Sequence, residues 1–205
     1  MGLQEAVAVS NKNIGPTGIW SINLAKKKHR FDFLLARAIK ELFPVGSEPS
    51  STADLGCGMG QYCTYLANEG WPNVVGYEGT KGIVSLPGTY PIIREVDLTD
   101  PQLPLLVPQS ELVLCLEVAE HIPQDYEEVF VNNIVAICLR WLLISWGHPG
   151  QSGTGHVNPR PQEYVIKIFQ GKGFEYCSNQ TTFLRSRAKE KYFRSNLIFM
   201  ERTMI

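Results

Sequence analysis

The stretch Asp54-Leu55-Gly56-Cys57-Gly58-Met59-Gly60 combines an acidic residue with three glycines at alternate positions. Glycine allows the backbone to take positive φ and brings its N–H groups close to a ligand. The residues that follow, Gln61 to Ala67, can open a helix behind such a turn. The stretch therefore predicts the turn of a nucleotide-binding βα unit.

The glycine spacing differs from that of the dinucleotide-binding fingerprint, whose third glycine would fall at Gln61. The carboxylate of Asp54 would repel a pyrophosphate, whereas it suits a cationic or polar ligand. We therefore expect this loop to face a ligand other than a phosphate.

The acidic residue and its three glycines resemble the first motif of the class I S-adenosylmethionine-dependent methyltransferases, in particular the small single-domain proteins of type 11 or 12. The resemblance covers roughly residues 51 to 146. It implies an α/β, Rossmann-like fold, with a mostly parallel seven-stranded sheet and helices on both faces. It also implies S-adenosylmethionine as the cofactor, with contacts from Asp54, Gly56, Gly58 and Gly60.

Length and composition fit one soluble domain. A chain of 205 residues with 44% hydrophobic and 19% charged residues can bury a sizeable core, and it is too short for two α/β domains of ordinary size. No apolar run could span a bilayer, so no membrane partner is expected. Because no secretory signal is visible near Met1, we expect a cytoplasmic protein.

The cysteines and the charge exclude several classes of site. Five scattered cysteines lack a Cys-x-x-Cys pair, so we expect reduced and mostly buried thiols. A net charge of −1 provides no global attraction to nucleic acid. Two basic runs, at residues 26–30 and 185–194, are more typical of solvated faces than of binding patches.

The N-terminal part precedes the predicted sheet. Residues 1–18 show little periodicity, and residues 19–43 have helical spacing that predicts one long helix or two with a break near Lys28. In the resembling methyltransferases such a leading segment lies over the cofactor as a lid.

We accordingly divide the chain into an N-terminal arm and helical lid at residues 1–46 and an S-adenosylmethionine-binding methyltransferase domain at residues 47–205. Trp20, within the lid, is interpreted as a core aromatic rather than as a ligand contact.

Short apolar runs predict the strands of a parallel sheet with intervening helices. The runs lie at residues 51–55, 73–78, 92–96, 111–116 and 141–146. Helices are predicted from the glycine loop to Glu69, at residues 126–138, and from residue 158 to Phe169. Residues 174–176 and 196–200 are candidates for the closing strands, which the resemblance implies form an antiparallel hairpin.

Acidic residues follow two of these strands. Glu78 ends the second strand, where related folds place an acid that accepts hydrogen bonds from both ribose hydroxyls. Asp97-Leu98 resembles the acidic and apolar pair that family members use around the adenine, with the carboxylate on the amine and the apolar side chain over the ring. The other expected cofactor contacts are Gly79, Leu116 and Glu117.

Methyl transfer to a hydroxyl requires alignment of donor and acceptor and removal of a proton. His121 is the leading candidate for the base, because it follows the fourth strand and an imidazole titrates near neutrality. Its alternative role is to anchor the next helix. Glu120 and His156 are further candidates, and His156 lies with His148 in a glycine-rich loop expected on the substrate side.

The same region suggests a metal site. Glu117, Glu120, His121 and the later His156 resemble the magnesium or manganese site of the small-RNA 2′-O-methyltransferases. Two carboxylates and two imidazoles suit a divalent ion that polarises a hydroxyl. The Glu-His pair also occurs in methyltransferases without a metal, so both alternatives remain open.

Three functions are compatible with the sequence. The first is methyl transfer to an oxygen or nitrogen of a small-molecule acceptor, which the short chain and near-neutral charge favour. The second is methylation of RNA or protein, including metal-assisted 2′-O-methyl transfer. The third is a non-catalytic S-adenosylmethionine-binding module. The identity of the acceptor and the oligomeric state do not follow from the sequence.

Overall fold

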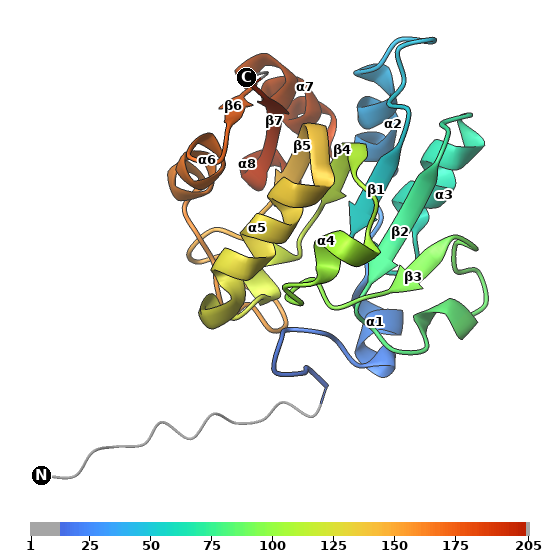
Figure 1. Cartoon of the computed structure of the whole chain (residues 1–205), viewed down its shortest axis with the longest axis vertical. Helices are drawn as coiled ribbons and strands as arrows, with labels where there is room; N and C mark the ends of the chain where they lie inside the picture. The colour runs from blue at the N-terminus through green and yellow to red at the C-terminus, as the bar shows by residue number, and fades with distance from the viewer. Residues whose placement is uncertain (1–12, 204–205) are drawn as a thin grey trace, which may run out of the picture.

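A seven-stranded sheet forms the centre of the computed structural model, which describes residues 13–203 (Figure 1). Its order is β3-β2-β1-β4-β5-β7-β6, with β7 antiparallel to both of its neighbours and the other pairs parallel. The strands are β1 (Thr52–Leu55), β2 (Val74–Glu78), β3 (Ile93–Glu95), β4 (Ser110–Cys115), β5 (Cys138–Ser145), β6 (Phe174–Tyr176) and β7 (Leu197–Arg202). The predicted single-domain α/β fold with a mostly parallel sheet is confirmed.

Helices cover both faces of the sheet. They are α1 (Ile22–Lys28), α2 (Phe33–Glu41), α3 (Gln61–Asn68), α4 (Leu103–Leu106), α5 (Glu127–Ile137), α6 (Gln162–Gln170), α7 (Ser178–Arg187) and α8 (Phe193–Asn196), with short 3₁₀ turns at Ile83–Ser85, Ala119–His121 and Gln124–Tyr126.

Alternation along β4 shows how the two faces are built. Leu112 and Leu114 enter a core with α2, α3 and α7, whereas Val113 and Cys115 enter a second core with α4, α5 and α6. All four side chains are fully buried. A continuous apolar strand is therefore required here, because both of its faces are covered.

The strand order reverses between β1 and β4. From β1 the chain continues outward to β2 and β3, and from β4 it continues to β5 on the other side. Open α/β sheets bind ligands at the carboxyl ends of the strands beside such a reversal. The loops after β1, β2 and β4 are therefore the expected walls of a site.

The N-terminal region forms two helices with a break after Lys28, which is one of the two predicted alternatives. Asp32, only 1% exposed, fixes the start of α2: its Oδ1 accepts a hydrogen bond from the backbone N–H of Leu35 at 3.0 Å. Its Oδ2 accepts from the N–H groups of Lys189 and Glu190, at 2.7 and 2.8 Å. Most of the predicted arm, residues 1–12, lies outside the described residues.

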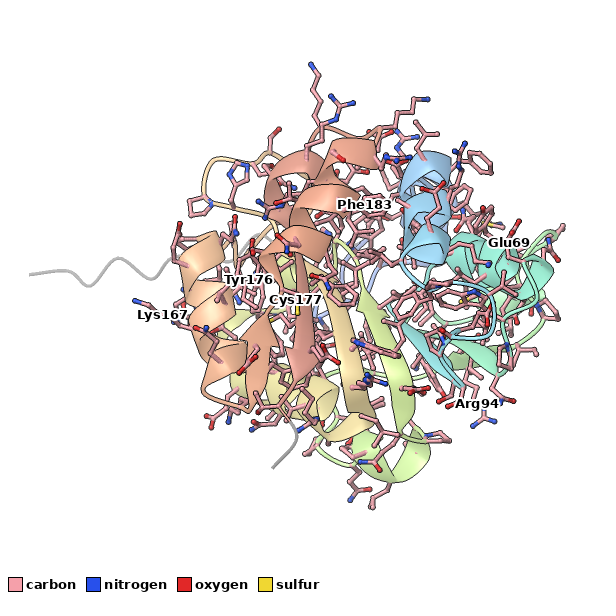
Figure 2. The ribbon with its side chains drawn as sticks, turned by 90° about the horizontal axis from the view of Figure 1, so that it is seen from above. Glu69, Arg94, Lys167, Tyr176, Cys177 and Phe183 are labelled. Carbon is pink, nitrogen blue, oxygen red and sulfur yellow. The ribbon has the colours of Figure 1, made fainter. Side chains whose placement is uncertain are left out.

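The sequence did not predict α7, which packs beside α2 and carries Phe183 (Figure 2). Only Thr181 and Leu184 of this helix are buried, so it lacks a strong apolar stripe. Asn196, expected to begin the last strand, instead ends α8. The predicted helix from residue 158 begins later, at Gln162.

The five cysteines are free thiols, and all except the half-buried Cys177 are buried. Within residues 13–203, no helix has the length and apolar character needed to cross a bilayer.

Candidate functional site

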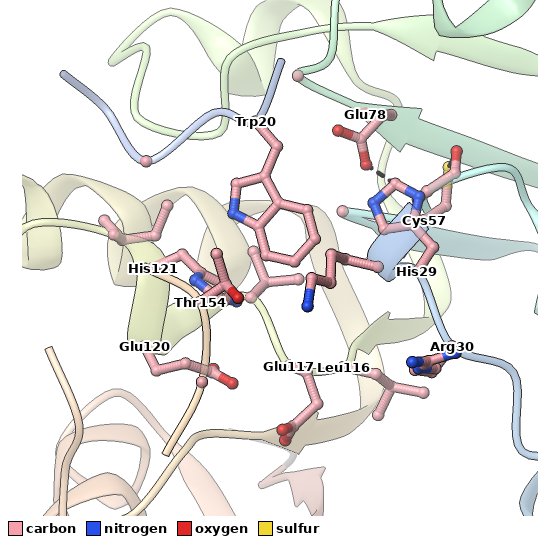
Figure 3. Close-up of a pocket in the computed structure, with 18 of the residues that line it drawn as sticks. Trp20, His29, Arg30, Cys57, Glu78, Leu116, Glu117, Glu120, His121 and Thr154 are labelled. Atoms are coloured by element: carbon pink, nitrogen blue, oxygen red, sulfur yellow. Dashed lines mark hydrogen bonds between the residues drawn. The ribbon is translucent and has the colours of Figure 1, made fainter. Parts of the chain in front are cut away.

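One pocket of about 390 Å³ lies where the loops after β1, β2 and β4 meet (Figure 3). Nine of the ten residues expected to contact the cofactor line this pocket: Asp54, Gly56, Gly58, Glu78, Gly79, Asp97, Leu98, Leu116 and Glu117. The tenth, Gly60, faces Tyr90 and Ile93 instead. The fold thus gathers residues from four strand ends around one cavity.

The glycine loop needs glycine for two reasons at once. Gly56 and Gly58 have φ of 77° and 59°, which side chains disfavour. A Cβ atom on Gly56 would lie 2.4 Å from Cγ2 of Val118, and one on Gly58 would lie 2.6 Å from Nδ1 of His29. The loop can therefore approach its neighbours only as bare backbone.

Glu78 is held in place by three donors. Its Oε2 accepts from the N–H of Gly58 at 2.9 Å, while Oε1 accepts from the N–H and hydroxyl of Thr80 at 2.9 and 2.8 Å. An ionised carboxylate has about four acceptor positions, so it can accept further hydrogen bonds from a ligand.

Asp54 sits beneath the loop and is 3% exposed. Burial raises the pKa of its carboxyl to about 7, the thiol of Cys63 at 3.5 Å opposes this rise, and the negative charge of Glu78 adds to it. A protonatable acid thus lies under the glycine loop.

Asp97 and Leu98, which follow β3, form another part of the pocket wall. The N–H and the hydroxyl of Thr99 both donate to Oδ1 of Asp97, at 2.9 and 2.7 Å. Leu98 is 6% exposed and presents an apolar surface to the pocket. This pairing of a fixed carboxylate with an apolar side chain can bind a flat polar ring.

Glu120, His121 and His156 also line the pocket and come together in one group, which we call the acid–imidazole cluster. One ligand atom from each lies within 4.8 Å of the others. The Nδ1 atoms of the two histidines lie 3.1 Å from backbone carbonyl oxygens, of Gly155 for His121 and of Gln151 for His156. Because a carbonyl only accepts, each Nδ1 carries a proton, and Nε2 is the ring nitrogen that remains for other contacts; Nε2 of His156 lies 3.8 Å from Oε1 of Glu120.

The charges in this cluster are strongly affected by burial. Glu120 is fully buried and neither of its oxygens has a hydrogen-bond partner. Burial, and then the negative charge of Glu117, raise the pKa of Glu120 well above its ordinary value. Burial also lowers the pKa of His121 to about 4. The cluster therefore presents a carboxyl group that needs either a proton or a cation.

Glu117 lies beside this cluster, close enough for its charge to act on Glu120, but it is not one of the three grouped ligands. Its Oε1 accepts from the side-chain amide of Asn196 at 2.6 Å, and its Oε2 accepts from that of Gln151 at 2.8 Å. Of the four residues considered as metal ligands, the structure thus brings three into one group. The partners of Glu117 lie 79 and 34 residues away in sequence, so no local pattern could have indicated them.

The N-terminal segment contributes residues to the wall of the pocket. The rings of Trp20 and His29 are stacked, 5.6 Å apart and 7° from parallel, and Trp20 also meets the edge of His121 at 4.9 Å (Figure 3). Trp20, interpreted from the sequence as a core aromatic, therefore lines the pocket. His29 was missed; its Nδ1 is buried without a partner, and burial lowers its pKa.

The second basic run is largely used within the fold. Arg185 donates to the carbonyl of Leu197, Arg187 pairs with Glu41 at 3.2 Å, and Arg194 donates to the carbonyl of Ala188. All three arginines of this run are therefore engaged within the fold, whereas Lys189 and Lys191 are exposed.

Comparison with known proteins supports the fold. No protein-family model and no curated protein matches the sequence. Among solved structures, the magnesium protoporphyrin IX methyltransferase ChlM from Synechocystis PCC 6803, with bound SAH, is 16% identical, with a TM-score of 0.62 over 88% of this chain and 92% of that chain. A TehB-like SAM-dependent methyltransferase from Corynebacterium glutamicum is 18% identical, with a TM-score of 0.61 over 89% and 93%.

The cyclase SpnF is 14% identical, with a TM-score of 0.57 over 83% of this chain and 80% of that chain. These similarities establish that the chain has the fold of the class I S-adenosylmethionine-dependent methyltransferases.

Proposed function

We propose that the protein transfers the methyl group of S-adenosylmethionine to an oxygen or nitrogen of a small-molecule acceptor. One observation carries the proposal: a single pocket is lined by the glycine loop, Glu78 and Asp97 on one side and by the acid–imidazole cluster on the other. Donor and acceptor groups bound to these two sides would meet inside the same cavity.

Residues at the ends of successive strands match successive parts of the cofactor. Asp97 and Leu98 after β3 suit an adenine, and Glu78 at the end of β2 suits the ribose hydroxyls. The bare backbone at Gly56 and Gly58 leaves room for the remaining part beside β1 and β4. A volume of about 390 Å³ lies within the usual range of small-molecule sites.

When bound, the cofactor supplies a methyl group on a positively charged sulfur. His121 is suited to take the proton of the acceptor at Nε2, because its Nδ1–H is committed to Gly155. With a pKa of about 4 it is neutral at pH 7, and it is a weak base. Such a base suits an acceptor whose proton is readily lost.

We propose that residues 14–30 cover the pocket. Ile19 packs on Gly79, where a Cβ would lie 2.6 Å from Cγ1 of Ile19, and Gly18 lies against the carbonyl of His121. In contrast, α2 packs on α3 and α7. We therefore assign α2 to the methyltransferase domain and restrict the lid to the segment before it.

Metal-assisted transfer is a second candidate, favoured by the carboxyl group of Glu120, which has no hydrogen-bond partner and lies 3.8 Å from Nε2 of His156. Glu120, with Nε2 of His121 and of His156, provides the mixed oxygen and nitrogen ligands that divalent ions such as Mn²⁺ accept. Such an ion would polarise an acceptor hydroxyl. The backbone carbonyls of Gly155 and Gln151 accept hydrogen bonds from the two imidazoles and so orient them for this role.

The fold alone does not require methyl transfer, since SpnF has it and is named a cyclase. The test supplies methyl-labelled S-adenosylmethionine to the protein with fractions of a cell extract. Label in small molecules, and its loss in a His121→Gln variant, is the expected result. Label in RNA or protein alone contradicts the proposal, and cofactor binding without any labelled product indicates a non-catalytic module.

A further inference from the structure

Glu117, two residues after the end of β4, is held in an unusual backbone conformation. Its φ of 55° lies in the left-handed region, which costs free energy for a residue with a Cβ atom. Its N–H donates to the hydroxyl of Ser145 at 2.7 Å, which fixes this conformation. Strain of this kind is retained where it places a side chain for a purpose.

The side chain of Glu117 is fixed as firmly as its backbone. Asn196 reaches it from α8 and Gln151 reaches it from the loop after β5, with hydrogen bonds of 2.6 and 2.8 Å. Asn196 is 3% exposed, so this contact is made inside the protein. The carboxylate is therefore presented to the pocket from a defined position.

Both donors are neutral amides, so no direct ion pair accompanies the carboxylate of Glu117. Among residues 13–203, no lysine, arginine or histidine nitrogen lies within 4.0 Å of its carboxylate. Lys28 and Arg30 line the same pocket without pairing with it. A carboxylate that is hydrogen-bonded but electrically unpaired attracts a cation into the pocket.

The strand order indicates which cation. If the adenine lies at β3 and the ribose at β2, the sulfur end of the cofactor lies at β1 and β4, where Glu117 follows Leu116. Resting on the proposed function, we infer that Glu117, positioned by Asn196 and Gln151, recognises the positive charge of the sulfonium donor. Methyl transfer leaves the carbon–sulfur electron pair on sulfur, so the product is a neutral thioether that this carboxylate no longer attracts. The pocket thereby prefers the charged donor to its product.

The test is calorimetric and needs no acceptor. Three probes are titrated in the presence of EDTA: S-adenosylmethionine, its neutral product S-adenosylhomocysteine, and sinefungin, which carries an amine in place of the methylsulfonium. Glu117→Gln keeps the shape and removes the charge. We expect it to weaken both cationic probes by about tenfold relative to the neutral one. Glu128→Gln, at an exposed position of α5, is the matched control and should leave the ratio unchanged.

A second variant protects the test against misfolding. Gln151→Met leaves the charge of Glu117 but removes one of its two amide donors, so it should reduce the preference for the cationic probes by a smaller factor. The inference alone is overturned if the ratio of affinities for the cationic and neutral probes is the same in the wild type and in both variants, with the fold intact by circular dichroism. A wild-type protein that binds none of the three probes overturns the proposed function, and this inference with it.

Discussion

Nδ1 of His121 lies 3.1 Å from the carbonyl oxygen of Gly155, a residue 34 positions later in the chain. The loop after β5 therefore sets the tautomer of an imidazole that follows β4. The same loop holds His156 through the carbonyl of Gln151. One loop thus orients both histidines of the acid–imidazole cluster.

Burial of His121 predicts a pH dependence of stability. Its pKa falls from 6.5 to about 4 on folding, so the unfolded chain binds more protons between these values. The contribution of His121 to stability is therefore present above pH 6.5 and is lost as the pH falls through 4, by up to about 3 kcal/mol.

Urea unfolding at pH 7 and pH 4.5 measures this loss. The loss of stability between pH 7 and pH 4.5 should be smaller in His121→Gln than in the wild type. In His148→Gln, whose ring is exposed, the loss should equal that of the wild type. The comparison needs the variants because Asp54, with a pKa raised to about 7, acts in the opposite direction. An equal loss in all three proteins would contradict the burial of a neutral His121.

Replacement of Glu78 by alanine should weaken cofactor binding. The carboxylate is oriented by Gly58 and Thr80 and would form charge-assisted hydrogen bonds with a ribose. Calorimetry with S-adenosylmethionine should show a loss of about 1 kcal/mol or more. Glu95→Ala, at the exposed end of the neighbouring β3, should bind as the wild type does. Unchanged affinity in Glu78→Ala would remove this residue from the site.

Asp32 should be important for stability although it lies outside the pocket. Its carboxylate accepts three backbone hydrogen bonds, one that caps α2 and two from the chain after α7. Asp32→Ala leaves these donors unpaired and should lower the free energy of unfolding by about 3 kcal/mol. Urea denaturation measures this loss, with Asp125→Ala as the control because Asp125 is an exposed aspartate. A loss no larger than that of the control would exclude this anchoring role.

The strands and the cofactor wall were predictable because they depend on local sequence. A buried parallel strand such as β4 must be apolar at consecutive positions, and the largely buried β2, which ends at Glu78, could be recognised in this way. The parallel topology then brings these strand ends together.

The remaining features depend on contacts between distant segments. The amide of Gln151 reaches Glu117 from a loop and that of Asn196 reaches it from the four-residue helix α8, and no periodicity places either segment. Helix α7 is held by tertiary packing rather than by an apolar stripe. The long-range role of Asp32 gave no signal either, because its two donors beyond α2 lie 157 and 158 residues later.

The last prediction separates the metal-assisted mechanism from simple acid–base catalysis. If the acid–imidazole cluster holds a divalent ion, His156→Ala removes one ligand, and Mn²⁺ affinity measured by electron paramagnetic resonance should fall at least about tenfold. His148→Ala is the matched control, because His148 is an exposed histidine of the same loop that lies outside the cluster.

Chelation completes the comparison. With a metal, exhaustive chelation should abolish methyl transfer while the affinity for S-adenosylmethionine stays nearly unchanged, because the ion would engage the acceptor and not the sulfonium. Without one, chelation has no effect, and His156→Ala leaves any pH midpoint that belongs to His121 where it was. Full activity after chelation, together with no Mn²⁺ binding by the wild type, would eliminate the metal-assisted mechanism and leave His121 as the base.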